Sequence, residues 1–345
     1  MANFTERTFG IEIETVTRIE LRSLPARIRE LTHLRCSYVS DDIHNDNAAP
    51  GWKVVHDGSV HGVGAEVVSP VLHGLDGLSQ VQKICSALRE LGCAPDTSTG
   101  LHVHQGAADL SEVQRLAVAA MYTKYESVVF ALLHQNRRHS DYAISWRHIC
   151  PNQAIFKEYT RSDPDNYRSQ QNIRGVFHDR YHAVNFVAAF NRHQTCEFRQ
   201  HHGSVDFNEM KSWIVLTQLF IEAGKNDRHK WTDIPSNAVH HWFRMTQALG
   251  VKDVPNDATV RDALKFFRQV YLRNGGNNGE HDGLSIEERA QNRLPGRSAL
   301  DPASRPSPPT VPSQPASVVP PPLSAADLLL HPETIATFAY IRASP

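Results

Sequence analysis

Ionisable residues separated by one position recur as pairs in three short segments of the sequence. The pairs are Glu12 with Glu14, His102 with His104, and Glu197 with Arg199. Residues i and i+2 of a β-strand point to the same face of a sheet. The positions between and before the paired residues are apolar or cysteine, so each segment reads as a strand with one core face and one ionisable face. The pattern predicts that the two ionisable side chains of each pair share one face of a strand.

Each pair taken alone has an ordinary explanation, such as a solvated strand face or a salt bridge between Glu197 and Arg199. The combination, together with a further acid at Glu66 in an apolar setting, favours chemistry. Close carboxylates repel each other unless a cation lies between them. Oxygen-rich sites with an imidazole suit Mg²⁺ or Mn²⁺ better than zinc, and an arginine can hold a phosphoryl group with two hydrogen bonds. The residues therefore indicate a magnesium site that handles phosphate.

Strand and helix patterns alternate over residues 4–272, which predicts one mixed α and β domain. Strands are expected at Thr8–Thr15, Trp52–Val55, Gly64–Ser69, Leu101–His104, Ala183–Phe190 and Thr195–Gln200. Helices are expected at Leu21–Leu31, Leu78–Leu91, Glu209–Ala223 and Val260–Leu272, with a further helix from a Ser111/Gln114 capping box to about His134. Gly224 is expected to end the helix at Glu209–Ala223.

The other segments differ in composition. Residues 135–175 are polar and rich in Asn, Arg and His, as in an active-site loop or lid, although a plain solvated loop fits equally well. Residues 273–322 are first Gly/Asn-rich and then Pro/Ser-rich, which predicts a disordered linker. Residues 323–345 regain apolar side chains and form a short tail. That tail is a candidate for docking on the domain or on a partner, and a marginal free helix is the alternative.

The overall composition is that of a soluble globular protein. The 345 residues are 40% hydrophobic and 21% charged, with a formal net charge of −1. This charge predicts neither a nucleic-acid partner nor a membrane surface. No apolar run is long enough to span a bilayer, and the first residues lack the apolar core of a signal peptide. Five cysteines without CxxC spacing argue against a disulfide framework and predict a cytoplasmic location.

The order of the motifs resembles that of the amidoligases, which belong to the glutamine synthetase and glutamate–cysteine ligase superfamily. The motifs are Phe9–Thr15 (FGIEIET), Asp57–Ser59 (DGS), Glu66–Pro70 (EVVSP), Gly100–Gly106 (GLHVHQG), Arg180–Asn185 and Thr195–Arg199 (TCEFR). The resemblance covers about residues 8–220. It implies an α+β fold in which a curved antiparallel β-sheet, a half-barrel of the glutamine synthetase catalytic-domain type, carries helices on its outer face.

The resemblance also implies roles for individual residues. The metal ligands it implies are Glu12, Glu14, Glu66, His102 and Glu197. The nucleotide contacts it implies are His104 near the phosphates, Arg199 on the transferred phosphoryl group, and Arg180 and Asn185 as substrate or phosphate contacts. The catalytic candidates are Arg199, Asp57 and Glu66, with Asp57 placed to contact or deprotonate the amine.

The activity implied is ATP-dependent ligation of a carboxylate to an amine through an acyl phosphate, with Mg²⁺ or Mn²⁺. The N-terminal domain and ammonia-site loops of glutamine synthetases are not recognised here, which favours a larger amine than ammonia. The substrates can be small molecules, peptides or protein side chains. Three alternatives remain at this stage: a phosphotransferase of the related guanidino-kinase type, a metal-dependent hydrolase using His102 and His104, and a binding module that kept the fold.

Overall fold

A computed structural model describes residues 3–40, 51–135, 137, 140–146, 180–190, 193–226, 242–251 and 255–274. By its contacts the chain divides into Met1–Ser298 and Ala299–Pro345, and all the described residues belong to the first unit. Most of the expected loop at 135–175 lies outside the described residues. So do almost all of the expected linker at 273–322 and the whole of the tail at 323–345.

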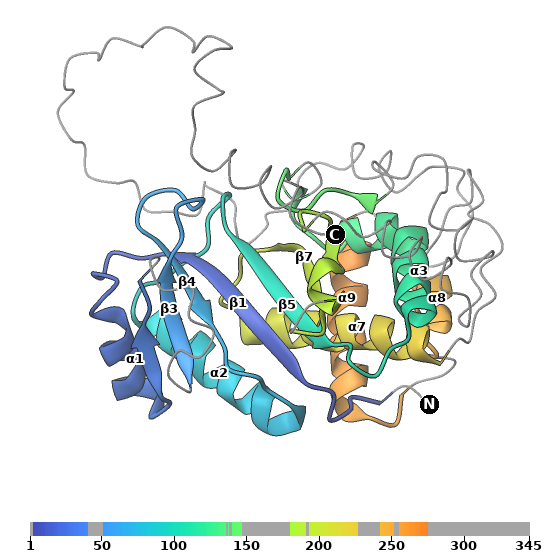
Figure 1. Cartoon of the computed structure of the whole chain (residues 1–345), viewed down its shortest axis with the longest axis horizontal. Helices are drawn as coiled ribbons and strands as arrows, with labels where there is room; N and C mark the ends of the chain where they lie inside the picture. Colours follow the sequence, from blue (N-terminus) through green and yellow to red (C-terminus); the bar gives the residue numbers. More distant parts are fainter. Residues whose placement is uncertain are drawn as a thin grey trace, which may run out of the picture. The chain divides into compact units, whose positions relative to one another are not determined.

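One seven-stranded sheet forms the framework of the first unit (Figure 1). Its strands are β1 Phe9–Val16, β2 Cys36–Tyr38, β3 Trp52–His56, β4 Gly64–Val68, β5 Gly100–Gly106, β6 Val184–Asn185 and β7 Thr195–His202. They lie in the order β2-β3-β4-β1-β5-β7-β6. Neighbouring strands are antiparallel except β2 and β3, which are parallel. The sheet is therefore open and mixed, and β1 lies at its centre.

The helices complete a mixed α+β fold. They are α1 Leu24–Thr32, α2 Gly74–Glu90, α3 Glu112–Phe130, α7 Phe207–Lys225, α8 Trp242–Ala248 and α9 Ala258–Arg273. Helix α7 packs on β5 and contacts α2, α3 and α9, so it is the centre of the helical layer (Figure 1). Among the helices that the structure describes, none has the length and apolar character needed to cross a membrane.

The expected alternation of strand faces is confirmed. The residues expected on the core face are all fully or almost fully buried, namely Ile11, Ile13, Leu101, Val103, Cys196 and Phe198. They belong to one hydrophobic core with the inner faces of α2, α3, α7 and α9. Burying aliphatic and aromatic side chains on one face contributes about 1.5–3 kcal/mol for each. This face fixes the sheet against the helices and leaves the other face for polar side chains.

The sequence misjudged the strand expected at Ala183–Phe190. Only Val184 and Asn185 pair with β7, and Val187–Phe190 form the 3₁₀-helix η2. The cause is local, because the Asn185 side-chain oxygen accepts a hydrogen bond from the Val187 backbone N–H at 2.9 Å. Such an Asx turn competes with the ladder and ends the strand. The short elements β2 and α8 were not predicted at all.

The sequence correctly predicted the N-terminal cap of α3. Ser111 and Gln114 form the reciprocal capping box at the start of α3, with N–H···O distances of 2.8 and 3.2 Å. The helix ends at Phe130, a few residues before the expected His134.

Gly224 does not end α7, as the sequence suggested, but lies inside the helix. A Cβ atom at this position would meet the Val118 Cγ2 atom of α3 at 2.3 Å and the Val118 backbone nitrogen at 3.1 Å. The glycine therefore permits the close approach of α3 and α7. Helix propensity alone would favour Gly224→Ala by about 1 kcal/mol.

We expect the opposite sign: Gly224→Ala should lower the free energy of unfolding by about 1–3 kcal/mol, because the methyl group overpacks the helix interface. Chemical denaturation of the purified chain measures this. Val118→Ala and the double variant complete a mutant cycle, in which the smaller residue at 118 should relieve the clash. A Gly224→Ala variant more stable than the parent would contradict the close packing.

Candidate active site

The ionisable pairs of neighbouring strands lie side by side on one face of the sheet. Glu12 of β1 is the register partner of His102 of β5, and Glu14 is the partner of Glu66 of β4. On the other side, His104 of β5 is the partner of Glu197 of β7. Four adjacent strands thus bring together the acids and histidines that the sequence singled out. We call these six residues, Glu12, Glu14, Glu66, His102, His104 and Glu197, the acid–histidine cluster.

His102 lies at the centre of this cluster. Its Nδ1 atom is 2.9 Å from Glu12 Oε2, and its Nε2 atom is 3.3 Å from Glu14 Oε1. Nδ1 is also 3.6 Å from Glu197 Oε1. The second histidine, His104, approaches Glu12 Oε1 at 3.0 Å through Nε2. Each oxygen of Glu12 therefore faces a different imidazole.

Two overlapping sets of potential metal ligands share His102. Glu12, His102 and Glu197 form one set, and Glu14, Glu66 and His102 form the other. Within each set, one ligand atom from every residue lies within 4.8 Å of the others. Four carboxylates and two imidazoles make an oxygen-rich donor set, which fits Mg²⁺ or Mn²⁺ better than a thiolate or all-imidazole site would. The residues present therefore fit the group that the sequence implied.

His104 and Glu12 hold opposite charges. Burial alone would raise the pKa of Glu12, but the charge of His104 and hydrogen bonds from both histidines outweigh it and lower the pKa well below its usual range. Burial would lower the pKa of His104, but Glu12 and Glu197 raise it to about 9. His104 therefore carries a proton at neutral pH when no cation is present.

Glu66 shows the opposite behaviour. Burial, then the negative charges of Glu12, Glu14 and Asp57, and a hydrogen bond with Glu12 raise the pKa of Glu66 well above its usual range. This carboxyl group therefore retains a proton where an ordinary glutamate has lost it. A divalent cation bound beside such a crowded acid would favour its ionised form.

Binding of Mg²⁺ should therefore release protons from this cluster. A cation at Glu14 and Glu66 favours the ionised form of Glu66, so the Mg²⁺ affinity should increase as the pH rises through the raised pKa of Glu66. Calorimetric titrations in two buffers with different protonation enthalpies measure the number of protons released. Glu66→Gln, which carries no titrating proton at this position, should release fewer protons. Equal release by parent and variant would count against this assignment.

Glu197 is held at both carboxylate oxygens. The Arg199 guanidinium forms a short ion pair with Oε1, and the Asn185 amide donates a hydrogen bond to Oε2 at 2.7 Å. Arg199 also donates through Nε to the backbone oxygen of Tyr142 at 3.1 Å. Asn185, Glu197 and Arg199 thus lie together, while the roles assigned to them stay predictions.

Arg137 is a buried cation beside the cluster that the sequence did not single out. Its guanidinium donates to the backbone oxygen of Arg199 at 2.9 Å and interacts with the charge of Glu14. Gly100 brings the same groups together, because its N–H donates to Glu14 Oε2 at 2.6 Å and a Cβ there would lie 3.0 Å from an Arg137 nitrogen. The polar composition of residues 135–175 was the only sequence signal, and no spacing distinguished Arg137 from the other arginines.

Two of the predicted residues lie apart from the cluster. Asp57 Oδ1 accepts hydrogen bonds from the Ser59 backbone nitrogen at 2.8 Å and the Ser59 hydroxyl at 2.7 Å, so it closes the turn between β3 and β4. Its charge still reaches Glu66. Arg180 is exposed, donates to the Tyr181 hydroxyl at 3.1 Å, and lies over the Tyr181 ring. Those interactions do not place Arg180 among the cluster residues.

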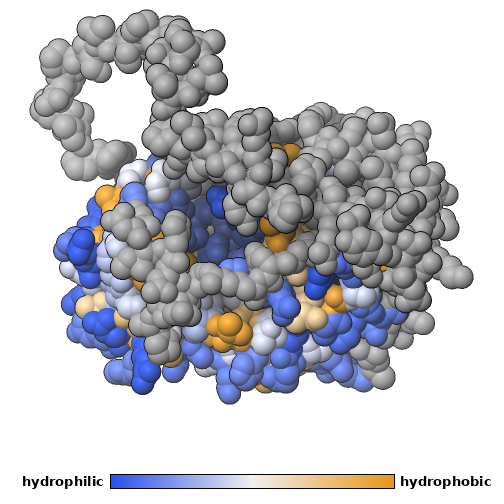
Figure 2. Space-filling model, viewed as in Figure 1, coloured by the Kyte–Doolittle hydropathy of each residue, from blue (hydrophilic) through white to orange (hydrophobic). Residues whose placement is uncertain are grey.

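The surface is hollowed over the sheet in the view of Figure 1, and the residues visible inside the hollow are hydrophilic (Figure 2). Ligand sites are concave, and a few precisely placed polar groups in them fix the orientation of the ligand. The apolar face of the same strands is buried against the helices, so the cluster rests on a well-packed support.

Comparison with protein families gives a match over more than half of the chain. The sequence model described as "Putative amidoligase enzyme" matches residues 5–221. This range includes every residue of the acid–histidine cluster, together with Asp57, Asn185 and Arg199. A search of curated proteins gives no match.

Comparison with solved structures gives a distant likeness to a bifunctional glutathione synthetase from Pasteurella multocida. The sequences are 12% identical and the TM-score is 0.39, over 77% of this chain and 48% of the other. The chain thus spans about half the length of that protein. A likeness at this level supports no argument about the site.

Proposed function

The chain belongs to the amidoligase family, and from this premise we propose that it is an ATP- and magnesium-dependent enzyme that joins a carboxylate to an amine. Family membership supports a ligase of the carboxylate–amine kind. The observation that carries the finer proposal is the convergence of four glutamates, two histidines and Arg199 on one face of the sheet. Such a set suits a nucleotide whose phosphates are held through divalent cations.

Glu12, Glu14, Glu66, His102 and Glu197 would hold the cations, Mg²⁺ or Mn²⁺. When bound, these ions would offset the charge of the ATP phosphates and of the phosphoryl group in transit. The protein residues would hold the cations and the nucleotide in position. The short bond network around His102 fixes the side chains of the acids before the nucleotide arrives, which lowers the reorganisation required during reaction.

Arg199 is the residue that we assign to the transferred phosphoryl group. Its guanidinium is held between Glu197 and the Tyr142 backbone oxygen and retains some exposure to the polar face. A planar guanidinium can donate two parallel hydrogen bonds to phosphoryl oxygens. His104 lies next to the same acids and would contact the phosphates.

The proposed reaction has two steps. The substrate carboxylate attacks the γ-phosphorus of ATP, giving an acyl phosphate and ADP. The amine then attacks the acyl carbon, a nearby carboxylate accepts its proton, and phosphate leaves. Asp57 and Glu66 are the candidates for that carboxylate. Asp57 lies apart from the cluster, but its charge reaches Glu66, and Arg180 and Asn185 are further candidate substrate or phosphate contacts.

Related proposals concern the fold and the setting of the enzyme. We assign the open sheet to the half-barrel of the glutamine synthetase type, with its polar face as the concave face.

A reducing cytoplasm agrees with the four described cysteines, which are buried and unbridged. Burial raises the pKa of the Cys85 and Cys196 thiols to about 12, so these thiols are unreactive. The acceptors can be small molecules, peptides or proteins, and the tail at 323–345 is a candidate partner-binding segment.

The direct test incubates the purified full chain with Mg·ATP and panels of carboxylates and amines, and measures ADP together with amide. Hydroxylamine added in place of the amine should trap an acyl phosphate as a hydroxamate. A stable phosphorylated product without amide would identify a phosphotransferase instead. Cleavage of an amide without nucleotide would identify a hydrolase, and absence of both Mg·ATP binding and turnover would contradict the proposal.

A further inference from the structure

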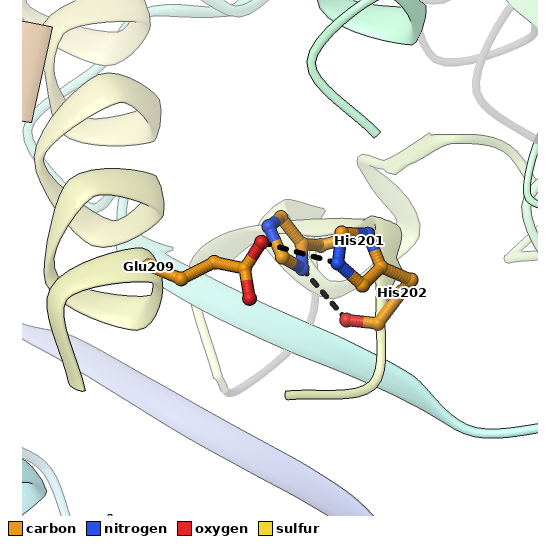
Figure 3. A group of neighbouring side chains, drawn as sticks. All are labelled: His201, His202 and Glu209. Atoms are coloured by element: carbon orange, nitrogen blue, oxygen red, sulfur yellow. Dashed lines mark hydrogen bonds and ion pairs between the residues drawn. The ribbon is translucent and has the colours of Figure 1, made fainter. Parts of the chain in front are cut away.

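A second group of metal-ligating side chains lies where β7 ends and α7 begins. His201 and His202 are the last residues of β7, and Glu209 is in the first turn of α7. One ligand atom from each of the three lies within 4.8 Å of the others. Figure 3 shows the Glu209 carboxylate reaching from the helix toward the two rings. No step of the proposed ligation uses these residues.

An irregularity in β7 places His201 here. Phe198 pairs with Val103 and His201 pairs with Leu101, so β7 contains one more residue than β5 over this stretch. Such a bulge changes the face to which the following side chains point. Without it, His201 would continue the polar face of Glu197 and Arg199. With it, His201 is fully buried, and its ring packs 5.0 Å from the Trp213 ring of α7, measured between centroids.

The two ring nitrogens of His201 have different environments. Nδ1 lies 2.7 Å from the His202 backbone oxygen, so Nδ1 carries the hydrogen of the neutral ring. Nε2 then presents a lone pair, and among the described residues it has no hydrogen-bond partner. In Figure 3 the ring edge with this nitrogen is turned toward the Glu209 carboxylate. Burial, followed by the charge of His202, lowers the pKa of His201 to about 3, so this lone pair is free at neutral pH.

Glu209 and His202 complete the group. His202 Nε2 lies 3.1 Å from Glu209 Oε1, and the Ser204 hydroxyl donates to Glu209 Oε2 at 2.6 Å. Burial would raise the pKa of Glu209, but the hydrogen bond from His202 and the neighbouring charges outweigh it and lower the pKa to about 2. Glu209 is therefore an ionised carboxylate whose orientation is fixed by Ser204. A backbone carbonyl behind one histidine and a hydroxyl behind the carboxylate are the outer contacts typical of metal ligands.

We propose that His201, His202 and Glu209 bind a zinc ion, at a site separate from the acid–histidine cluster and beyond the proposed ligase function. Two imidazoles and one carboxylate are a donor set that zinc uses, with bonds of about 2.0–2.2 Å. Tetrahedral coordination would bring the ligand atoms to roughly 3.3 Å from one another, a modest contraction from their present spacing. The fourth position would be left to water.

Two features oppose binding and limit the affinity. His202 Nδ1 accepts a hydrogen bond from the His134 backbone N–H at 3.2 Å, so Nε2 carries the hydrogen of the neutral ring. Coordination through Nε2 would move that hydrogen to Nδ1 and break the bond to His134. The Arg137 guanidinium is also close enough to lower the pKa of His201, and its charge would repel a cation. The Glu209 carboxylate offsets this charge.

Zinc at this site would join the end of β7 to the start of α7. The same strand carries Glu197 and Arg199, and the same helix supports the core face of the sheet. The expected role is therefore structural. The loss of the hydrogen bond from the His134 backbone N–H would also give zinc binding a local signature.

The test uses the full chain after removal of metals with a chelator, in excess Mg²⁺ so that the acid–histidine cluster does not compete for zinc. Equilibrium dialysis with metal analysis should find one bound zinc per chain. His201→Gln and Glu209→Gln should lose it, and Ser204→Ala should weaken it about tenfold, as losses of outer contacts do. The matched control is His73→Gln, which removes an exposed histidine whose Nδ1 lies 3.2 Å from Glu6 Oε2 and should leave zinc binding unchanged.

His102→Gln disrupts the acid–histidine cluster and should retain this zinc, which separates the site from the proposed ligase chemistry. Loss of zinc in His102→Gln but not in Glu209→Gln would overturn the proposal. If the His201→Gln variant does not fold, measurements on the parent protein still test the proposal. Zinc should shift the His134 amide signal in NMR spectra, and a parent chain that holds no zinc, or holds it without that shift, would also overturn the proposal.

Discussion

Replacement of Glu12 by glutamine is expected to lower the rate of ATP-dependent amide formation by about a thousandfold, which corresponds to about 4 kcal/mol of transition-state stabilisation. Each oxygen of Glu12 faces a different histidine, at 2.9 and 3.0 Å. An amide retains one oxygen but loses the charge and presents an NH₂ group to an imidazole. The variant should therefore lose both cation affinity and the orientation of His102 and His104.

Steady-state release of ADP and calorimetric binding of Mg·ATP would measure these two losses separately. Glu30→Gln is the matched control, because Glu30 is exposed on α1 and pairs only loosely with Arg27 at 3.1 Å. Circular dichroism would verify that both variants fold. A folded Glu12→Gln enzyme with a rate within tenfold of the parent would show that Glu12 is not a ligand in the reaction.

Replacement of Arg199 by methionine should lower kcat by a factor of about 10³ or more, as removal of an arginine does at other phosphoryl-transfer sites. The guanidinium offsets charge that grows only during transfer, so the KM for ATP should change much less than kcat. Arg199→Lys should restore part of the rate, since lysine keeps the charge but not the two parallel hydrogen bonds.

The control for this series is Arg27→Met, a loss of an exposed arginine on α1. The methionine variant also leaves Glu197 without its ion pair, although Asn185 still donates to it. A thermal melt would report any resulting instability separately from the kinetics. If KM rises while kcat is unchanged, Arg199 contributes to uniform binding of the nucleotide and not to the transfer step.

The sequence predicted the composition of the site because strand periodicity is local. The spacing of two in Glu12/Glu14, His102/His104 and Glu197/Arg199 sufficed to assign them to a common kind of face. It could not give the register, which decides that Glu12 meets His102 and that Glu14 meets Glu66. Register depends on pairing between segments far apart in the chain, and period-two arguments do not contain it.

The misjudged parts also have physical causes. The Val187 backbone N–H donates a hydrogen bond to the Asn185 side chain, and the segment continues as a 3₁₀-helix where a strand was expected. The extra residue in β7 removed His201 from the polar face on which strict alternation would place it. Arg137 reaches the cluster from a connecting segment, where no periodicity exists. Each of these features depends on one bond or one residue, so composition and residue pattern do not predict it.

The position of β1 has a consequence for biosynthesis. Of the seven strands of this sheet, β1 is translated first, yet in the finished sheet it is flanked on one side by β4 and on the other by β5. Both of its edges remain open to wrong partners until those later strands have been translated. Glu12 and Glu14 alternate along it with Ile11 and Ile13, and charged residues on a nascent strand oppose aggregation. The acids that we propose as cation ligands would thus also reduce aggregation of the nascent chain.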